Sequence, residues 1–171
     1  MSKLNYANRY QKNRYQRGMT LIEILIALAI TIAFTVAVLV VYNGNIKPNM
    51  YVNDKVQAFT TLTTGLDNSK ELNGGAYPAA SSAVTLPITN PSTPQQNLIY
   101  QASGGDNPNY SGWQYTCNNG TLTIGVNVSD TASTTLQQNV ETAIASDNSD
   151  FTCTAVSNGM FTCSKSNVVC K

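Results

Sequence analysis

The chain has 171 residues, of which only 11% are charged, and its formal net charge is +1. Histidine is absent, which excludes Ser-His and Cys-His catalytic pairs and argues against most zinc sites. Residues 1–18 hold five cations and no acid, whereas residues 19–171 hold the other five cations and all nine acids, a balance of −4. This mildly acidic main part does not suit a broad nucleic-acid-binding surface, so we expect no nucleic-acid contact.

The N-terminal region combines a cationic leader with an apolar run. Residues 1–18 lack apolar periodicity and are predicted to form a disordered or weakly helical tail. From Ile24 to Val41 only Thr31 and Thr35 interrupt the run, which is long enough to cross a hydrocarbon core of ~30 Å as a helix. The excess of cations before it predicts a cytoplasmic N-terminus. An ordinary secretory signal is the alternative, although the run is long for one.

One carboxylate, Glu23, lies at the start of this run. A charge near a bilayer centre costs on the order of 2.5–3.5 kcal/mol on insertion scales. An acidic residue here is therefore a candidate functional residue that requires a partner. The alternative is that Glu23 lies at the headgroup level, solvated and without a role.

An amphipathic helix is predicted beyond the span, over residues 43–73. Gly44 and Pro48 predict a bend or local melting near its beginning. Gly74 and Gly75 predict its end. Its apolar stripe recurs at helical spacing: Val52, Val56, Phe59, Leu62 or Thr63, and Leu66.

The segment from Gly74 to Pro108 is rich in proline and in small polar residues. It is predicted to be an irregular loop that packs on the surface, with at most short strands such as Leu98–Tyr100. A disordered linker is the alternative. The apolar residues scattered along the segment favour packing.

Two hairpins and a helix are predicted in the C-terminal part. The first hairpin pairs residues 113–117 with 121–128 around the turn 118–120, and the second pairs 151–156 with 160–163 around 157–159. A helix is expected between them, over residues 133–146.

Four cysteines, Cys117, Cys153, Cys163 and Cys170, lie in this part. Beyond a membrane span, an even count predicts two disulfides and an oxidising compartment, and four reduced thiols are the alternative. Cys153 and Cys163 fall opposite each other if their hairpin loop has three residues and are offset if it has two. Three connectivities remain open, with a preference for a bridge from Cys163 or Cys170 to an earlier strand.

The segment Gly18-Met19-Thr20-Leu21-Ile22-Glu23 followed by an apolar helix resembles the processing site of type IV prepilins and prepilin-like proteins. Four elements coincide in it: a basic leader, glycine before the cut, glutamate at the fifth position after the cut, and an uninterrupted span. The 18-residue leader and Met19 at the first mature position favour the type IVb pilins. Four cysteines in place of a single C-terminal pair depart from the usual pattern.

The resemblance implies processing and assembly. A membrane-embedded prepilin peptidase would cut between Gly18 and Met19 on the cytoplasmic side and N-methylate Met19. Glu23 would then pair with the amine of Met19 on a neighbouring copy as the helices enter a fibre. This pairing would select one register, because a mismatched copy leaves the charge unpaired. The partners are therefore copies of the same chain, the peptidase and an inner-membrane pilus assembly machinery.

The resulting expectation is an α+β fold. Its parts are a cleaved leader (1–18), a transmembrane and fibre-core helix (19–42), an amphipathic helical half (43–73) and a head (74–171). The long N-terminal helix would pack on an antiparallel sheet that has a disulfide-bonded C-terminal region. The precursor would reside in a bacterial inner membrane with its head in the periplasm, and the mature chain in a surface pilus.

The expected function is that of a structural subunit of a type IV pilus, without enzymatic activity, cofactor or metal, serving adhesion, aggregation, motility or DNA uptake. The alternative is a pseudopilin or minor pilin of a type II secretion-like machine. Calcium binding at Asp147-Asn148-Ser149-Asp150 would fit that alternative, although a polar turn is the simpler interpretation. A membrane-anchored periplasmic enzyme or binding protein is the third hypothesis, and no metal-ligand cluster or phosphate loop supports it.

Overall fold

The computed structural model describes residues 20–171, which divide into two units, residues 20–42 and residues 43–171. The first unit is α1 (Leu21–Val41), a helix with no buried residue. Residues Tyr42–Ile46 form η1, a π-helical turn. The sequence predicts a bend or melting near Gly44 and Pro48, and the structure has this π-helical turn there. Pro48 has no N–H to offer the Gly44 carbonyl, so the regular α-helical pairing is interrupted at this point.

The second unit is built on α2 (Lys47–Leu72). Its fully buried residues recur at three- and four-residue spacing, as expected for an amphipathic helix: Ala58, Phe59, Leu62, Leu66 and Ser69. Val52 and Val56, the first two residues of the predicted stripe, are only partly buried. The core therefore begins about three turns into α2.

The end of α2 follows the expected glycine signal. Gly74 and Gly75 have φ values of 68° and 84°, a region that glycine adopts without steric cost. The Gly75 N–H donates to the Lys70 carbonyl at 2.9 Å, which is the closing bond of a Schellman motif. The two glycines thus turn the chain out of the helix and towards the sheet.

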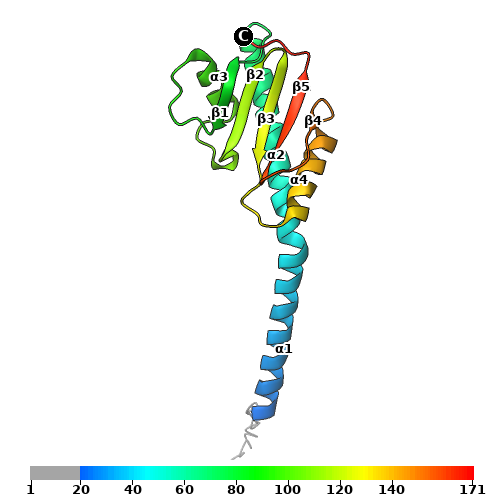
Figure 1. The fold of residues 1–171 in the computed structure, drawn as a ribbon. Helices are drawn as coiled ribbons and strands as arrows, with labels where there is room; N and C mark the ends of the chain where they lie inside the picture. The colour runs from blue at the N-terminus through cyan, green and yellow to red at the C-terminus, as the bar shows by residue number, and fades with distance from the viewer. Residues whose placement is uncertain (1–19) are drawn as a thin grey trace, which may run out of the picture. The chain divides into compact units, whose positions relative to one another are not determined.

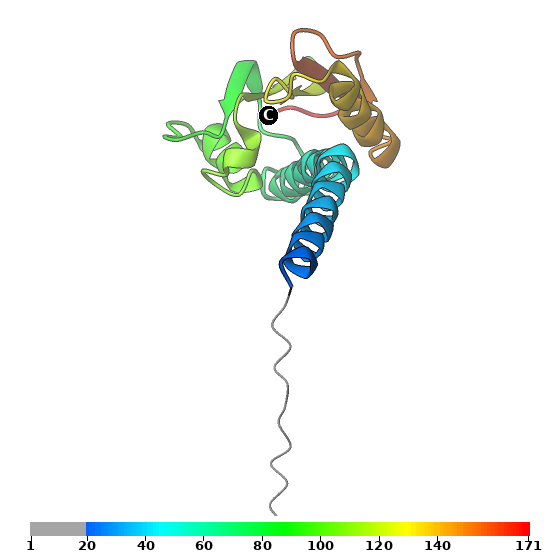
Figure 2. The same ribbon diagram turned by 90° about the horizontal axis from the view of Figure 1, so that it is seen from below.

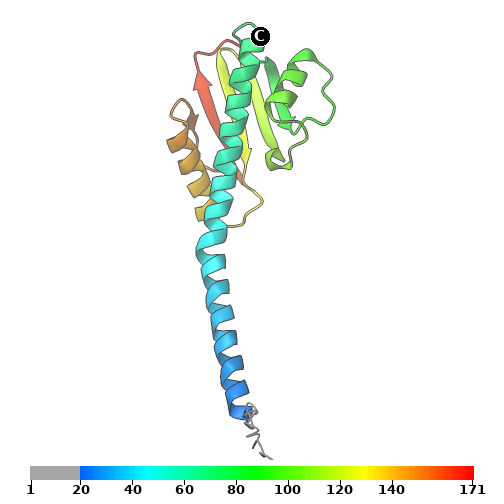
Figure 3. The ribbon, with the colours of Figure 1, turned by 180° about the vertical axis from the view of Figure 1, so that it is seen from behind.

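The sheet of the second unit is antiparallel, with strand order β1-β2-β3-β5-β4. Its strands are β1 (Ala80–Leu86), β2 (Trp113–Asn118), β3 (Thr121–Asn127), β4 (Thr152–Cys153) and β5 (Met160–Ser166). Figures 1 and 3 show α2 crossing one face of this sheet, and within residues 43–171 Figure 1 shows no helix over the opposite face. The expected fold class, a helix packed on an antiparallel sheet, is confirmed.

Two shorter helices contact α2 on its two sides, α3 (Pro94–Ala102) and α4 (Thr134–Asp147), as Figure 2 shows. The core between α2 and the sheet is aromatic. Trp113 is fully buried, and its ring lies 5.2 Å from that of Tyr110 and 6.3 Å from that of Phe59, centroid to centroid. Tyr110 belongs to η2 (Pro108–Tyr110), a short 3₁₀ helix, and its hydroxyl donates to the Ala58 carbonyl of α2.

The segment between Gly74 and Pro108 is more regular than the sequence predicts. The expected short strand at Leu98–Tyr100 is wrong, because these residues lie in α3. The Thr93 hydroxyl accepts from the Gln96 N–H at 3.2 Å, and Pro94 occupies the first turn, so a complete helix-start signal precedes them. The segment also holds β1, a seven-residue strand where only short strands were expected.

Both predicted hairpins are present, with turns one residue tighter than expected. Asn119-Gly120 and Asn158-Gly159 all have positive φ, between 50° and 77°, as in two-residue type I′ turns. Asn118 pairs with Thr121 across the first turn. The predicted helix over residues 133–146 is also confirmed as α4, which is capped by the Ser133 hydroxyl accepting from the Leu136 N–H.

Candidate functional site

The two residues predicted to flank the cleavage point, Gly18 and Met19, lie outside the described residues, as does the cationic leader. The first described residue is Thr20, which directly precedes α1. The part of the candidate site that the structure describes is therefore Thr20, Glu23 and the surface of α1.

Thr20 and Glu23 form a reciprocal capping box at the start of α1. The Thr20 N–H donates to Glu23 Oε2 at 2.8 Å, and the Glu23 N–H donates to Thr20 Oγ1 at 3.4 Å. The first backbone N–H groups of a helix have no partner within it, and these bonds supply acceptors for two amides. A carboxylate in the first turn also faces the positive end of the helix dipole. Sequence analysis missed this role, although Thr-x-x-Glu before an apolar run is the signal for it.

The rest of α1 is an apolar surface. Every one of its residues is exposed, and its helical stretch is long and apolar enough to cross a membrane by length and composition. Its two polar interruptions are satisfied within the helix. The Thr31 hydroxyl donates to the Ala27 carbonyl and the Thr35 hydroxyl donates to the Thr31 carbonyl, each at 2.8 Å. Neither hydroxyl therefore requires water, which suits a helix surrounded by lipid or by other apolar helices.

Glu23 is the exception on this surface. Its Oε2 is used by the capping box, and its Oε1 accepts no hydrogen bond among residues 20–171. A carboxylate with one oxygen held by the backbone and the other free can still accept a charged donor. The geometry thus fixes the position of Glu23 while leaving it able to bind an ammonium group.

The four candidate cysteines form two disulfides, Cys117–Cys170 and Cys153–Cys163. The first joins β2 to the chain after β5, with 5.6 Å between Cα atoms, and fits the preference for a bridge from the C-terminal tail to an earlier strand. The tail is also held by hydrogen bonds, since the Tyr77 N–H donates to the Val169 carbonyl and the Lys171 N–H donates to the Tyr77 carbonyl.

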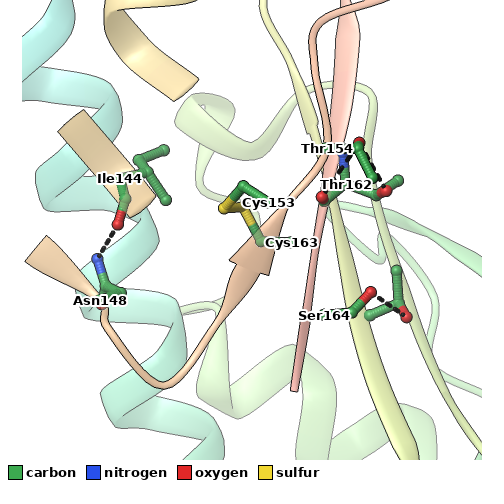
Figure 4. The surroundings of a disulfide bond; sticks show 8 residues. Ile144, Asn148, Cys153, Thr154, Thr162, Cys163 and Ser164 are labelled. Atoms are coloured by element: carbon green, nitrogen blue, oxygen red, sulfur yellow. Dashed lines mark hydrogen bonds between the residues drawn. A yellow bond between two sulfur atoms is a disulfide. The ribbon is translucent and has the colours of Figure 1, made fainter. Parts of the chain in front are cut away.

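The second disulfide, shown in Figure 4, crosses the β4–β5 hairpin between directly opposed residues whose Cα atoms are 4.0 Å apart. The expectation that a two-residue loop would leave Cys153 and Cys163 offset is wrong. Ser157 pairs with Met160 across the turn, and Thr154 donates its N–H to the Thr162 carbonyl. Two residues, 155 and 156, therefore face one residue, 161, and this irregularity restores the opposition of the cysteines.

The acidic segment proposed for calcium, Asp147 to Asp150, follows the end of α4. Asp150 forms an ion pair with Lys165 at 2.9 Å, which already balances one carboxylate. No group of three or more potential metal-ligating side chains occurs among the described residues. The segment therefore receives no structural support as a metal site.

Comparison with known proteins gives one match. No curated protein and no solved structure matches the chain. Residues 13–39 match the family model described as the prokaryotic N-terminal methylation motif. The match includes Gly18, Met19 and Glu23 and ends within α1, so it covers the predicted cleavage point and most of the apolar helix. The chain therefore carries a prepilin-type N-terminal methylation motif, and its remaining residues include a helix packed on an antiparallel sheet.

Proposed function

We propose that this chain is a structural subunit of a type IV pilus, cut between Gly18 and Met19 and assembled through α1. The observation that carries the proposal is Glu23 itself, one carboxylate fixed at the start of a helix whose other exposed side chains are apolar or internally satisfied. The match of residues 13–39 to the methylation motif supports the processing step.

In this proposal, α1 first anchors the precursor in the inner membrane, with its N-terminus in the cytoplasm and its head in the periplasm. Cleavage creates a new ammonium group at Met19, which the peptidase methylates. Oε1 of Glu23 then accepts a hydrogen bond from the ammonium group of a neighbouring copy. This pairing is needed because a buried carboxylate is tolerated only when it is paired. The partners are thus other copies of this chain, the peptidase and the assembly machinery, and the mature chain resides in a surface fibre.

The leader length and Met19 favour the type IVb class within this proposal. The competing assignment is a pseudopilin or minor pilin, which would share the processing and the helix. Electron microscopy of cells labelled with an antibody to the head separates them. Long surface fibres containing the chain support a major pilin, and short periplasmic assemblies or sparse labelling contradict it.

The charge of Glu23 and its capping role are tested by two substitutions. Glu23→Gln keeps an acceptor for the Thr20 N–H but removes the charge, whereas Glu23→Val removes both. Both variants are expected to insert and to be processed, because insertion depends on the apolar run. Both are expected to assemble few fibres when expressed alone. Normal fibres from Glu23→Gln would contradict pairing with an ammonium group, whatever the behaviour of Glu23→Val.

Two substitutions at Gly18 test the processing step. Gly18→Val places a branched side chain at the cleavage point, and we expect the full-length precursor to accumulate in the membrane, detected by its mass. Gly18→Ala should give a weaker defect. Complete removal of residues 1–18 from Gly18→Val would contradict recognition by a prepilin peptidase.

A further inference from the structure

The first turns of α2 are held to the head much less firmly than the rest of the helix. From Lys47 to Gln57 no residue is fully buried, and the buried series begins at Ala58. A cleft of about 290 Å³ separates the first turn from the start of α4, and its walls include Pro48 and Leu136. The apolar contacts of this segment with the core come from partly buried side chains: Tyr51, Val52 and Val56.

The strongest polar contacts in this region converge on Asp130. Lys55 Nζ lies 3.1 Å from Asp130 Oδ2, and the Tyr51 hydroxyl donates to Asp130 Oδ1. The Lys55 ammonium also donates to the Asn127 carbonyl at 3.3 Å and lies 5.5 Å from the centroid of the Tyr51 ring. The Lys55 side chain is 14% exposed and that of Asp130 is 53% exposed, so salt screens this pair in part, though less than the Lys165–Asp150 pair, whose side chains are 26% and 72% exposed.

Hydrogen bonds hold the connection that carries Asp130 to neighbouring parts of the head. It lies in the connection between β3 and α4, where the Val128 N–H donates to the Gly159 carbonyl at 2.8 Å. Asn127 Oδ1 accepts from the Ser129 N–H, and Asn127 Nδ2 donates to the Ser111 carbonyl. The carboxylate is thus presented from a hydrogen-bonded connection, whereas its two partners on α2 belong to a segment with little burial.

We propose that Asp130 is a latch that holds residues 47–57 of α2 on the head and can release them without unfolding the sheet. Released, these three turns would lose their contacts with the connection between β3 and α4, while α2 stays packed on the sheet from Ala58 onward. Local opening of this kind is expected where few apolar contacts are buried. The latch concerns the head alone and does not depend on the proposed pilus function.

Hydrogen exchange of the full chain in detergent micelles, followed by mass spectrometry or NMR, tests the latch. Asp130→Ala removes the acceptor for both Tyr51 and Lys55. We expect exchange within residues 51–57 to rise by about tenfold or more, while exchange within residues 59–69 of α2 and in β3 changes by less than about twofold. Lys55→Met keeps the aliphatic stem and leaves Asp130 in place, and it should show a smaller rise in the same segment.

The second ion pair of the head provides a matched control. Asp150 pairs with Lys165 at 2.9 Å, and the cleft that they line reaches α2 at Thr63 and Asp67, beyond residues 47–57. Asp150→Asn should leave the exchange of residues 51–57 unchanged. Unchanged exchange in both Asp130→Ala and Lys55→Met would overturn the proposal. An equal rise across α2 and β3 would also overturn it, because Asp130 would then stabilise the head as a whole.

Discussion

The Thr20 amide and the Glu23 carboxylate are joined by a hydrogen bond of 2.8 Å, so the residue proposed to recognise a neighbouring copy also caps its own helix. The two roles use different oxygens of one carboxylate. Capping holds the Glu23 carboxylate at the first turn of α1, and in the proposed fibre this fixed carboxylate would select the register between copies.

Replacing Thr20 with valine tests the capping role. Thr20→Val removes the hydroxyl that accepts from the Glu23 N–H but keeps the shape of the side chain and the backbone N–H that binds Glu23. Loss of an N-cap acceptor costs about 1 kcal/mol, so the first turn of α1 should fray. Faster exchange of the Glu23 and Ile24 amides in micelles, against unchanged exchange at residues 30–38, would show it. Equal protection in both proteins would contradict a stabilising cap.

The two disulfides should differ in their contribution to stability. Cys117–Cys170 spans 53 positions and Cys153–Cys163 spans 10, so loop-closure entropy predicts about 4 and about 2.7 kcal/mol. Replacing the first pair with serine should therefore lower the free energy of unfolding by about 1.5 kcal/mol more than replacing the second. Trp113, the single tryptophan, is buried in the core and reports urea unfolding by fluorescence. A larger loss from the shorter loop would contradict this order.

Gly65 of α2 packs directly against the backbone of Ala102, the last residue of α3. A Cβ atom built there would lie 2.2 Å from the Ala102 carbonyl oxygen, so the helices must separate to accept any side chain. Gly65→Ala should destabilise the head by about 1–3 kcal/mol, the usual cost of overpacking, measured as a lower urea midpoint. Gly44→Ala is the matched control, since no atom lies within 4 Å of a Cβ at that helical position. Equal midpoints for Gly65→Ala and the unmodified chain would contradict the close contact.

The latch at Asp130 should depend on pH. Partial burial by itself raises the pKa of Asp130, but hydrogen bonds from Tyr51 and Lys55 and the Lys55 charge outweigh it and hold the pKa below its ordinary value of 3.8. The remaining charged group at the cleft is Lys47, among the described residues. A lowered pKa in the folded state means that the stabilisation is complete above 3.8 and is lost as pH falls through the folded pKa.

The difference in unfolding free energy between the unmodified chain and Asp130→Asn measures this linkage. It should be largest near neutral pH and shrink on acidification below the ordinary pKa. The same comparison with Lys55→Met in both proteins should show a weaker pH dependence, because the Lys55 hydrogen bond and charge are gone while the Tyr51 hydrogen bond remains. A difference that stays constant from neutral to strongly acidic pH would contradict the ionised latch.

Much of the fold follows from the sequence because strong local patterns dictate it. The apolar run, the glycines after α2 and the alternation around Asn119-Gly120 each predict the element that forms. The strand predicted at Leu98–Tyr100 is wrong because a short apolar run fits either a strand or a helix, and the Thr93-Pro94 start signal before it favours the helix.

The disulfide pairing and the latch could not be derived in this way. Four cysteines permit three pairings, and the opposition of Cys153 and Cys163 depends on an irregularity at residues 155–156 that no local pattern predicts. Asp130 and Lys55 are 75 positions apart, and only the return of the chain from β3 to α4 brings them together. Glu23 was identified from the sequence because a lone charge in an apolar run is costly wherever the helix lies.

The longer disulfide has a mechanical consequence. Cys117–Cys170 closes a covalent ring that contains β3, α4 and β4–β5, together with the second disulfide. When the chain is pulled at its two ends, this disulfide carries the tension, and β3, α4, β4 and β5 do not. As long as the bond is intact, the 53 positions that it spans, or roughly 180 Å of extended backbone, cannot be stretched out. Among the described residues before Cys117, the helices, β1, residues 113–116 of β2 and the connections between them could still lengthen, whereas β3, β4 and β5 are protected from force by one covalent bond.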